Sequence, residues 1–122
     1  MTHELTVHTR TTLAGPVIEL IGALDHHSAP DVRTLLPGLS LSPGQQLVID
    51  LDRLTFCDST GITVLIAARN HALAADASVV LTAVPERVSR TFRLVGLQDV
   101  FSMQPTSQAA AAAWTQPLPP SE

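Results

Sequence analysis

Hydrophobic and polar positions along the chain follow two different periods, and these periods predict a series of strands and helices. Residues 4–9 (ELTVHT) alternate Leu5 and Val7 with polar neighbours, and a longer apolar run at 15–24 (GPVIELIGAL) follows a turn-like Ala-Gly-Pro sequence. Alternation, a turn and a second apolar run are typical of a β-hairpin. We therefore expect the chain to begin with two antiparallel strands.

The next two segments predict a short helix and a buried strand. Segment 25–38 (DHHSAPDVRTLLPG) carries apolar residues at helical spacing, Ser28 stands three residues before Asp31 as in a capping box, and the Pro-Gly pair at its end stops the helix. Segment 45–51 (QQLVIDL) is a largely apolar run with β-branched residues. Such a run is typical of a strand that is covered on both faces or lies centrally in a sheet.

Beyond a short connection at 52–57 (DRLTFC), the pattern changes to that of a long helix. The residues that recur at helical spacing are Ile62, Leu65, Ile66, Arg69 and Leu73. Several alanines lie between them and leave the helix thin enough to pack closely. We expect this to be the most buried helix of the protein.

Four further elements complete the pattern. They are a strand at 77–84, a helix at 85–97, a short strand at 100–103 and a helix at 107–114. In the helix at 85–97, Pro85 is a favoured starting residue and Gly96 a favoured residue just past the end. Val88, Phe92 and Val95 share one face of it. We expect that face to be buried.

Strands that alternate with helices predict an α/β layer fold, and the initial hairpin makes its β-sheet mixed. A chain of 122 residues, of which 45% are hydrophobic, fits one domain with a substantial core. We assign this domain to residues 1–115 and expect residues 116–122 (QPLPPSE) to form a mobile tail.

The composition of the chain indicates the cellular compartment of the protein. No apolar run approaches the roughly 20 residues that span a bilayer, and no signal peptide opens the chain. The single cysteine, Cys57, cannot form an internal disulfide and fits a reducing compartment as a structural, buried residue. We therefore expect a cytoplasmic protein that has no contact with a membrane. Without a coiled coil or a long exposed apolar stretch, a monomer is the default expectation.

Charge argues against a nucleic-acid partner. The net charge is −4, and all seven basic residues are arginines. Only Arg87, Arg90 and Arg93 cluster, which is a poor electrostatic footprint for nucleic acid. We interpret this cluster as a solvated helix face, with a contact to an acidic partner as the alternative.

Asp58-Ser59-Thr60-Gly61 forms a small polar group between the connection and the long helix. Either Asp58 or Ser59 can cap that helix by accepting a hydrogen bond from a free backbone N–H. Capping alone is a sufficient explanation of the tetrapeptide.

Catalytic and metal sites find little support in the sequence. Ser59 could be a nucleophile with His26 or His27 as its base, but the chain lacks a G-x-S-x-G elbow and a glycine-rich oxyanion segment. The two adjacent histidines would point apart on a strand or a helix, so they do not predict a metal site. Glycine-rich phosphate loops are also missing. We expect no catalytic residue, no metal and no cofactor.

Two segments resemble a known family. Residues 22–36 (GALDHHSAPDVRTLL) and 47–69 (LVIDLDRLTFCDSTGITVLIAAR) are similar to the two signature segments of the STAS domain, specifically of bacterial anti-sigma factor antagonists. The F-x-x-x-G-L sequence at 92–97 extends the resemblance. It covers most of the chain, and the order and spacing of the motifs are more specific than any one motif.

The resemblance implies a partner-switching regulator. In that family the serine after the aspartate is phosphorylated by a cognate anti-sigma factor of the histidine-kinase-like ATPase fold, and Ser59 is the matching residue. The unphosphorylated protein would hold the anti-sigma factor and free a sigma factor, phosphorylation would release it, and a metal-dependent serine phosphatase would reset the cycle. The implied partner-binding residues are Asp25, His26, His27, Asp58, Ser59, Thr60 and Gly61. Chemistry alone leaves Thr60 open as the acceptor.

Two other interpretations remain from the sequence. The same fold could serve a different assembly, such as a stressosome-like complex or a transporter-associated module. A small serine-dependent enzyme is the alternative from another class, and it predicts a pocket that joins Ser59 to a histidine.

Overall fold

The computed structural model describes residues 4–115, which form a mixed β-sheet with helices on both faces. The strands are β1 (Leu5–Thr12), β2 (Gly15–Leu24), β3 (Gln46–Asp50), β4 (Leu54–Cys57), β5 (Ser78–Thr82) and β6 (Ser102–Gln104). The helices are α1 (Ala29–Leu35), the single 3₁₀ turn η1 (Leu36–Gly38), α2 (Ser59–Ala74), α3 (Glu86–Leu94) and α4 (Ser107–Ala113). The proposed tail at 116–122 lies outside the described residues.

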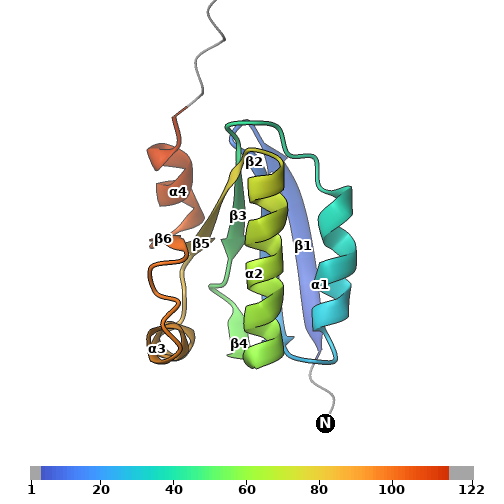
Figure 1. Ribbon diagram of the computed structural model, residues 1–122, viewed down its shortest axis with the longest axis vertical. Helices are drawn as coiled ribbons and strands as arrows, with labels where there is room; N and C mark the ends of the chain where they lie inside the picture. The colour runs from blue at the N-terminus through green and yellow to red at the C-terminus, as the bar shows by residue number, and fades with distance from the viewer. Residues whose placement is uncertain (1–3, 116–122) are drawn as a thin grey trace, which may run out of the picture.

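The strand order confirms the mixed α/β sheet. The order across the sheet is β1-β2-β3-β5-β6, with β1 antiparallel to β2 and the other pairs parallel. β4 pairs with the far half of β2, so β3 and β4 lie one after the other along the same neighbour. The carboxyl ends of β2 and β4 therefore reach the same edge of the sheet, at the bottom of Figure 1.

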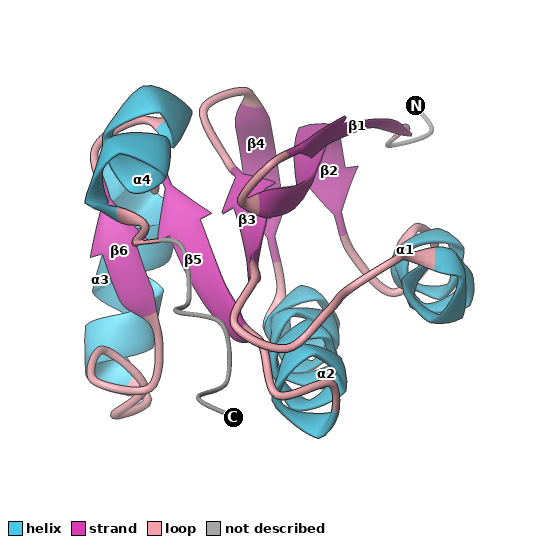
Figure 2. Ribbon diagram, turned by 90° about the horizontal axis from the view of Figure 1, so that it is seen from above, coloured by secondary structure: helices cyan, strands magenta, loops and turns pink. Residues whose placement is uncertain are grey.

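Two apolar clusters hold the layers together. Figure 2 shows α1 and α2 on one face of the sheet and α4 on the other. The larger cluster lies under α1 and α2 and includes the fully buried Leu20, Leu47 and Leu65. On the opposite face, one valine from each of β2, β3 and β5 packs with Ala110 of α4. The prediction that segment 45–51 is a buried central strand is confirmed.

The end and the buried face of α3 follow the sequence signals. Gly96 has a φ of +77°, its N–H donates to the carbonyl of Arg93, and the N–H of Leu97 donates to the carbonyl of Phe92. This is the Schellman arrangement expected of a glycine just past a helix. Val88 and Phe92 are buried, and the Phe92 ring stacks on Phe101 with the ring centroids 5.6 Å apart.

Several local predictions are wrong. Segment 52–57 is not only a connection, because Leu54–Cys57 form β4. This strand has four residues, and two adjacent ones, Thr55 and Phe56, are both exposed, so no two-residue period marks it.

Two residues predicted on buried helix faces are exposed. Leu73 lies in the last turn of α2 and Val95 is the C-cap of α3, and at these helix ends their exposed fractions are 48% and 56%. The capping box is also wrong: Ser28 stands at the N-cap of α1 but makes no side-chain cap hydrogen bond.

Candidate functional site

Asp58 ends β4 and caps α2. Its backbone N–H donates to the carbonyl of Leu24 at the end of β2 (3.2 Å), which ties the two strand ends together. Its backbone is extended, and its Oδ1 accepts the N–H of Gly61 at 2.9 Å. The structure thus decides between the two predicted caps: Asp58 is the cap, and Ser59 is the first residue of the helix.

The capping arrangement presents the Ser59 hydroxyl to solvent. Ser59 is exposed, whereas Thr60 is half-buried. Within the described part of the chain, the Ser59 hydroxyl makes no hydrogen bond, whereas the Ser59 carbonyl accepts one from Thr63 Oγ1 at 3.0 Å. Of the two candidate acceptors, Ser59 is the more accessible.

Gly61 allows the start of α2 to approach the strands closely. A Cβ placed on it would lie 2.6 Å from the carbonyl oxygen of Leu24 and 2.8 Å from Cys57 Sγ. Neither contact is possible for a real Cβ, so only glycine fits here. Gly61 therefore contributes to the site by position and not by a side chain.

The loop that follows β2 is built around Asp25. This carboxylate is almost fully buried, and its Oδ1 accepts the backbone N–H groups of His27 (2.9 Å) and Ser28 (3.0 Å). Burial works toward a higher pKa, but the hydrogen bonds from Ser28 and His27 outweigh it and hold the pKa of Asp25 below its ordinary value. Ser28 Oγ donates to the carbonyl of Ala23 at 2.7 Å. Asp25 thus shapes the loop from within.

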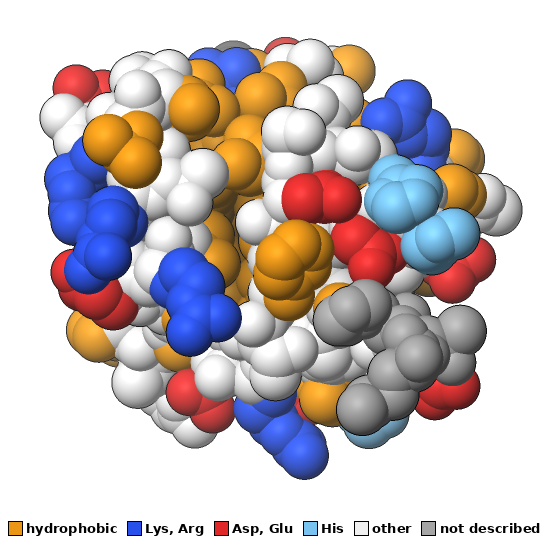
Figure 3. All heavy atoms as spheres, turned by 90° about the horizontal axis from the view of Figure 1, so that it is seen from below, with side chains coloured by type: hydrophobic (Ala, Val, Ile, Leu, Met, Phe, Trp, Pro, Cys, Tyr) orange, Lys and Arg blue, Asp and Glu red, His pale blue; other side chains and the backbone are white. Residues whose placement is uncertain are grey.

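His26 and His27 follow Asp25 in this loop, and His26 lies near the start of α2. Both are exposed, and their ring centroids are 4.1 Å apart. His26 Nδ1 lies 3.9 Å from Asp58 Oδ2. In Figure 3 the pale-blue histidines lie beside red carboxylate side chains at this end of the molecule. The fold therefore brings together the two segments that the sequence separates by some thirty residues.

Cys57 is a structural neighbour of the site. Burial, helped by the charge of Asp58, raises the pKa of the Cys57 thiol to about 12, so the thiol stays protonated at neutral pH. Its Sγ lies 3.6 Å from the Asp58 carbonyl, to which it donates. The prediction that Cys57 is not a nucleophile agrees with this environment.

The arrangement offers little for catalysis. The Ser59 hydroxyl has no imidazole partner among residues 4–115, since the nearby His26 ring contacts the Asp58 carboxylate instead. Among the same residues, no group of three histidine, cysteine or acidic side chains could hold a metal ion. No helix in the described range is long and apolar enough to cross a membrane.

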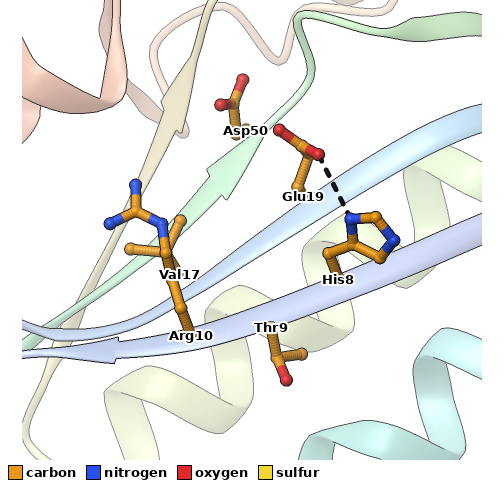
Figure 4. A pocket seen from close by; sticks show the side chains of 6 residues that line it. All are labelled: His8, Thr9, Arg10, Val17, Glu19 and Asp50. Carbon is orange, nitrogen blue, oxygen red and sulfur yellow. Dashed lines mark ion pairs between the residues drawn. The ribbon is translucent and has the colours of Figure 1, made fainter.

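A polar hollow of about 190 Å³ lies on the α4 side of the sheet, away from Ser59. The strand register aligns His8, Glu19 and Asp50 in one row across β1, β2 and β3. His8 Nδ1 lies 3.6 Å from Glu19 Oε1. Figure 4 shows Glu19 and Asp50 next to each other, with Arg10 on the side of the hollow opposite His8. Sequence reasoning missed this group, because only the register of three strands brings it together.

Sequence reasoning also missed a larger, apolar hollow beside the candidate site. It lies between β4 and α3, has a volume of about 620 Å³ and opens on the face that Figure 3 shows. Its lining residues are Leu54, Thr55, Phe56, Cys57, Pro85, Arg87, Val88 and Thr91. In the sequence, Arg87 belonged only to a cluster interpreted as a solvated helix face, with a contact to an acidic partner as the alternative, and no pattern indicated a hollow.

The sequence matches a known protein family and two of its named members. Residues 4–110 match the family model described as STAS domain. The chain is 30% identical over 87 residues to the anti-sigma-B factor antagonist of Listeria monocytogenes, which covers 71% of this chain and 76% of the relative. The protein of the same name from Bacillus subtilis is 30% identical over 91 residues, 75% of this chain and 83% of the relative.

A solved structure agrees with both relatives. The crystal structure of an anti-sigma factor antagonist from Mycobacterium paratuberculosis superposes with a TM-score of 0.74 at 25% identity, over 91% of this chain and 94% of the other. The likeness extends over nearly the whole of both chains.

Proposed function

Because this chain belongs to the STAS domain family, we propose that it is an anti-sigma factor antagonist whose partner binding is switched by phosphorylation of Ser59. The unphosphorylated form binds an anti-sigma factor of the histidine-kinase-like ATPase fold and so frees a sigma factor. Phosphorylation of Ser59 by that partner ends the complex, and a metal-dependent serine phosphatase restores the binding form. The chain acts as a substrate and binding module and has no catalytic role of its own.

The observation that carries this proposal is the position of Ser59, an exposed first residue of a helix whose cap is a different side chain. The first N–H groups of a helix have no partner within it. Asp58 takes the N–H groups of Gly61 and Ile62, which leaves those of Ser59 and Thr60 for solvent or for an anion. A phosphate on Ser59 therefore meets a favourable helix end, and the fold has no reason to change.

Phosphorylation destabilises the complex with the partner and not the fold of this chain. A phosphate adds about 1.5 to 2 negative charges at neutral pH. Here it appears beside the Asp58 carboxylate, on a surface that the partner must cover. Bringing that charge into an interface without a matching cation costs far more than leaving it in water. Phosphorylation thus weakens binding without unfolding either protein.

A pull-down from native cell extract tests the proposal. The baits are the wild type, Ser59→Ala, Ser59→Asp and the control Ser42→Asp, which places the same charge on an exposed serine of the loop before β3. We expect an ATPase-fold anti-sigma factor on every bait except Ser59→Asp. Capture of that partner by all four baits, or by none, contradicts the switch.

The captured partner then serves to locate the acceptor. The purified partner is incubated with ATP and wild type, and the modified residue is identified by mass spectrometry. We expect phosphate on Ser59 and unchanged labelling in Thr60→Val. Labelling at Thr60 or at neither residue contradicts the assignment of Ser59.

A further inference from the structure

The apolar hollow between β4 and α3 has the features of a docking site. Among the described strands, β4 pairs with β2 alone, so its other side faces the hollow. Phe56 on this strand is 41% exposed, which is unusual for a side chain of its size, and the buried Val88 of α3 forms part of the opposite wall. The hollow of about 620 Å³ can hold a large apolar side chain.

The α3 side of the hollow is positively charged, in a chain whose net charge is −4. Arg87 lines the hollow, and the exposed Arg90 follows one turn further along α3. Within residues 4–115, neither arginine forms an ion pair with a carboxylate, whereas Arg93 lies 3.7 Å from Glu86. In Figure 3 blue side chains border the orange hollow on one side, and red and pale-blue ones lie on the other. An occupant with acidic side chains would therefore be favoured.

The hollow lies next to the Ser59 site along the chain. Cys57 lines it, and the next two residues of the chain are Asp58 and Ser59. A partner that covers the start of α2 therefore lies next to the hollow. Contacts there would add area to an interface that at Ser59 alone is small and polar.

We propose that this hollow receives an acidic segment of the anti-sigma factor, with an apolar side chain inserted between β4 and α3 and carboxylates placed on Arg87 and Arg90. This inference rests on the proposed function, because the occupant belongs to the partner that Ser59 releases. It assigns the partner two separate contacts, an apolar and acidic one at the hollow and a charge-sensitive one at Ser59. Phosphorylation changes only the second.

Charge reversal tests the electrostatic half of the proposal. The dissociation constant of the purified anti-sigma factor is measured for the wild type, Arg87→Glu, Arg90→Glu and the control Arg33→Glu, an exposed arginine on α1. We expect Arg87→Glu to weaken binding by about tenfold or more and Arg90→Glu by a smaller factor, while Arg33→Glu changes it less than about twofold. Circular dichroism and thermal melting confirm that the variants are folded.

A photo-crosslinker identifies the occupant. Benzoylphenylalanine replaces Thr91 in the hollow and, as a control, Thr34 on α1. We expect Thr91 alone to crosslink to the partner, at a peptide with more acidic than basic residues. A crosslink to a basic segment, or equal Kd values for Arg87→Glu and wild type, overturns the docking site while the Ser59 switch stands. Failure of the wild type to bind any anti-sigma factor overturns the proposed function and this inference together.

Discussion

Asp58 Oδ1 accepts the backbone N–H of Gly61 at 2.9 Å, so the residue that caps α2 is the neighbour of the proposed phosphoacceptor and not the acceptor itself. Capping and switching are thereby divided between two adjacent side chains. Ser59 can change its charge without removing a hydrogen bond that holds the helix end. This division leads to a direct test.

Asp58→Ala should destabilise the fold, whereas Ser59→Ala should not. Loss of an aspartate cap typically costs about 1 kcal/mol of unfolding free energy. Ser59→Ala removes a hydroxyl that makes no hydrogen bond in the described structure, so its unfolding free energy should stay within about 0.5 kcal/mol of wild type. Urea unfolding at pH 7 measures both. Equal losses in the two variants would mean that Ser59 shares the cap.

Gly61→Ala should lower stability although alanine normally favours a helix. The new Cβ would lie 2.6 Å from the Leu24 carbonyl oxygen, and overpacking of this kind costs about 1–3 kcal/mol. Because the closest atom belongs to the backbone and cannot move aside cheaply, we expect a cost in the upper part of that range, which exceeds the gain of about 1 kcal/mol that alanine gives over glycine in a helix. Gly38→Ala is the matched control, since nothing lies within 4 Å of its added Cβ. Thermal melting should show a lower midpoint for Gly61→Ala only.

Asp25→Asn should change how the unfolding free energy depends on pH in the acid range. A carboxyl whose pKa is lower in the folded than in the unfolded protein stabilises the fold above its unfolded pKa, and the contribution is lost as pH falls through the folded value. Hydrogen bonds from Ser28 and His27 lower the pKa of Asp25. The variant should therefore be less stable than wild type at pH 7, and the difference should shrink below about pH 4.

Urea midpoints at pH 7 and in the acid range measure this difference. A gap between Asp25→Asn and wild type that does not change with pH would contradict the role assigned to the carboxylate.

Thr82→Val should stabilise the protein. Thr82 is fully buried in β5, and its Oγ1 has no hydrogen-bond partner among the described residues. Replacing a buried, unsatisfied hydroxyl by a methyl group of the same shape should raise the unfolding free energy by about 1 kcal/mol. Thr12→Val is the opposite case, because Thr12 Oγ1 donates to the Gly15 carbonyl at 2.8 Å. Urea unfolding should move the two variants in opposite directions.

Local sequence signals were sufficient where a few neighbouring residues decide the outcome. The alternation at Leu5 and Val7 predicted the first strand, and Gly96 predicted the end of α3, because a left-handed backbone favours glycine. The D-S-T-G sequence predicted the start of α2 but left two residues as its cap. The backbone made the choice, since Asp58 is extended whereas Ser59 already belongs to the helix.

Local sequence patterns gave no correct prediction where the conformation or burial of a residue depends on distant parts of the chain. Strand β4 has only four residues and owes its conformation to pairing with β2. Asp25 looks like a surface residue in its polar loop, but the packing of that loop buries its carboxylate. The hollow combines Phe56 with Arg87, residues that no local pattern connects.

The sequence by itself determined the order and type of most elements, because periodicity, capping and turn chemistry act within a few residues. The proposal of Ser59 as a phosphoacceptor came from the resemblance of its motifs to the STAS family and not from those local rules. Only the tertiary structure decided which of the candidate site residues reach solvent. It buries Asp25, exposes Ser59, places His26 3.9 Å from Asp58 and opens a hollow next to them. The physical reason is that burial and proximity arise from contacts between distant segments, which the pairing of β2 with β4 brings to one edge of the sheet.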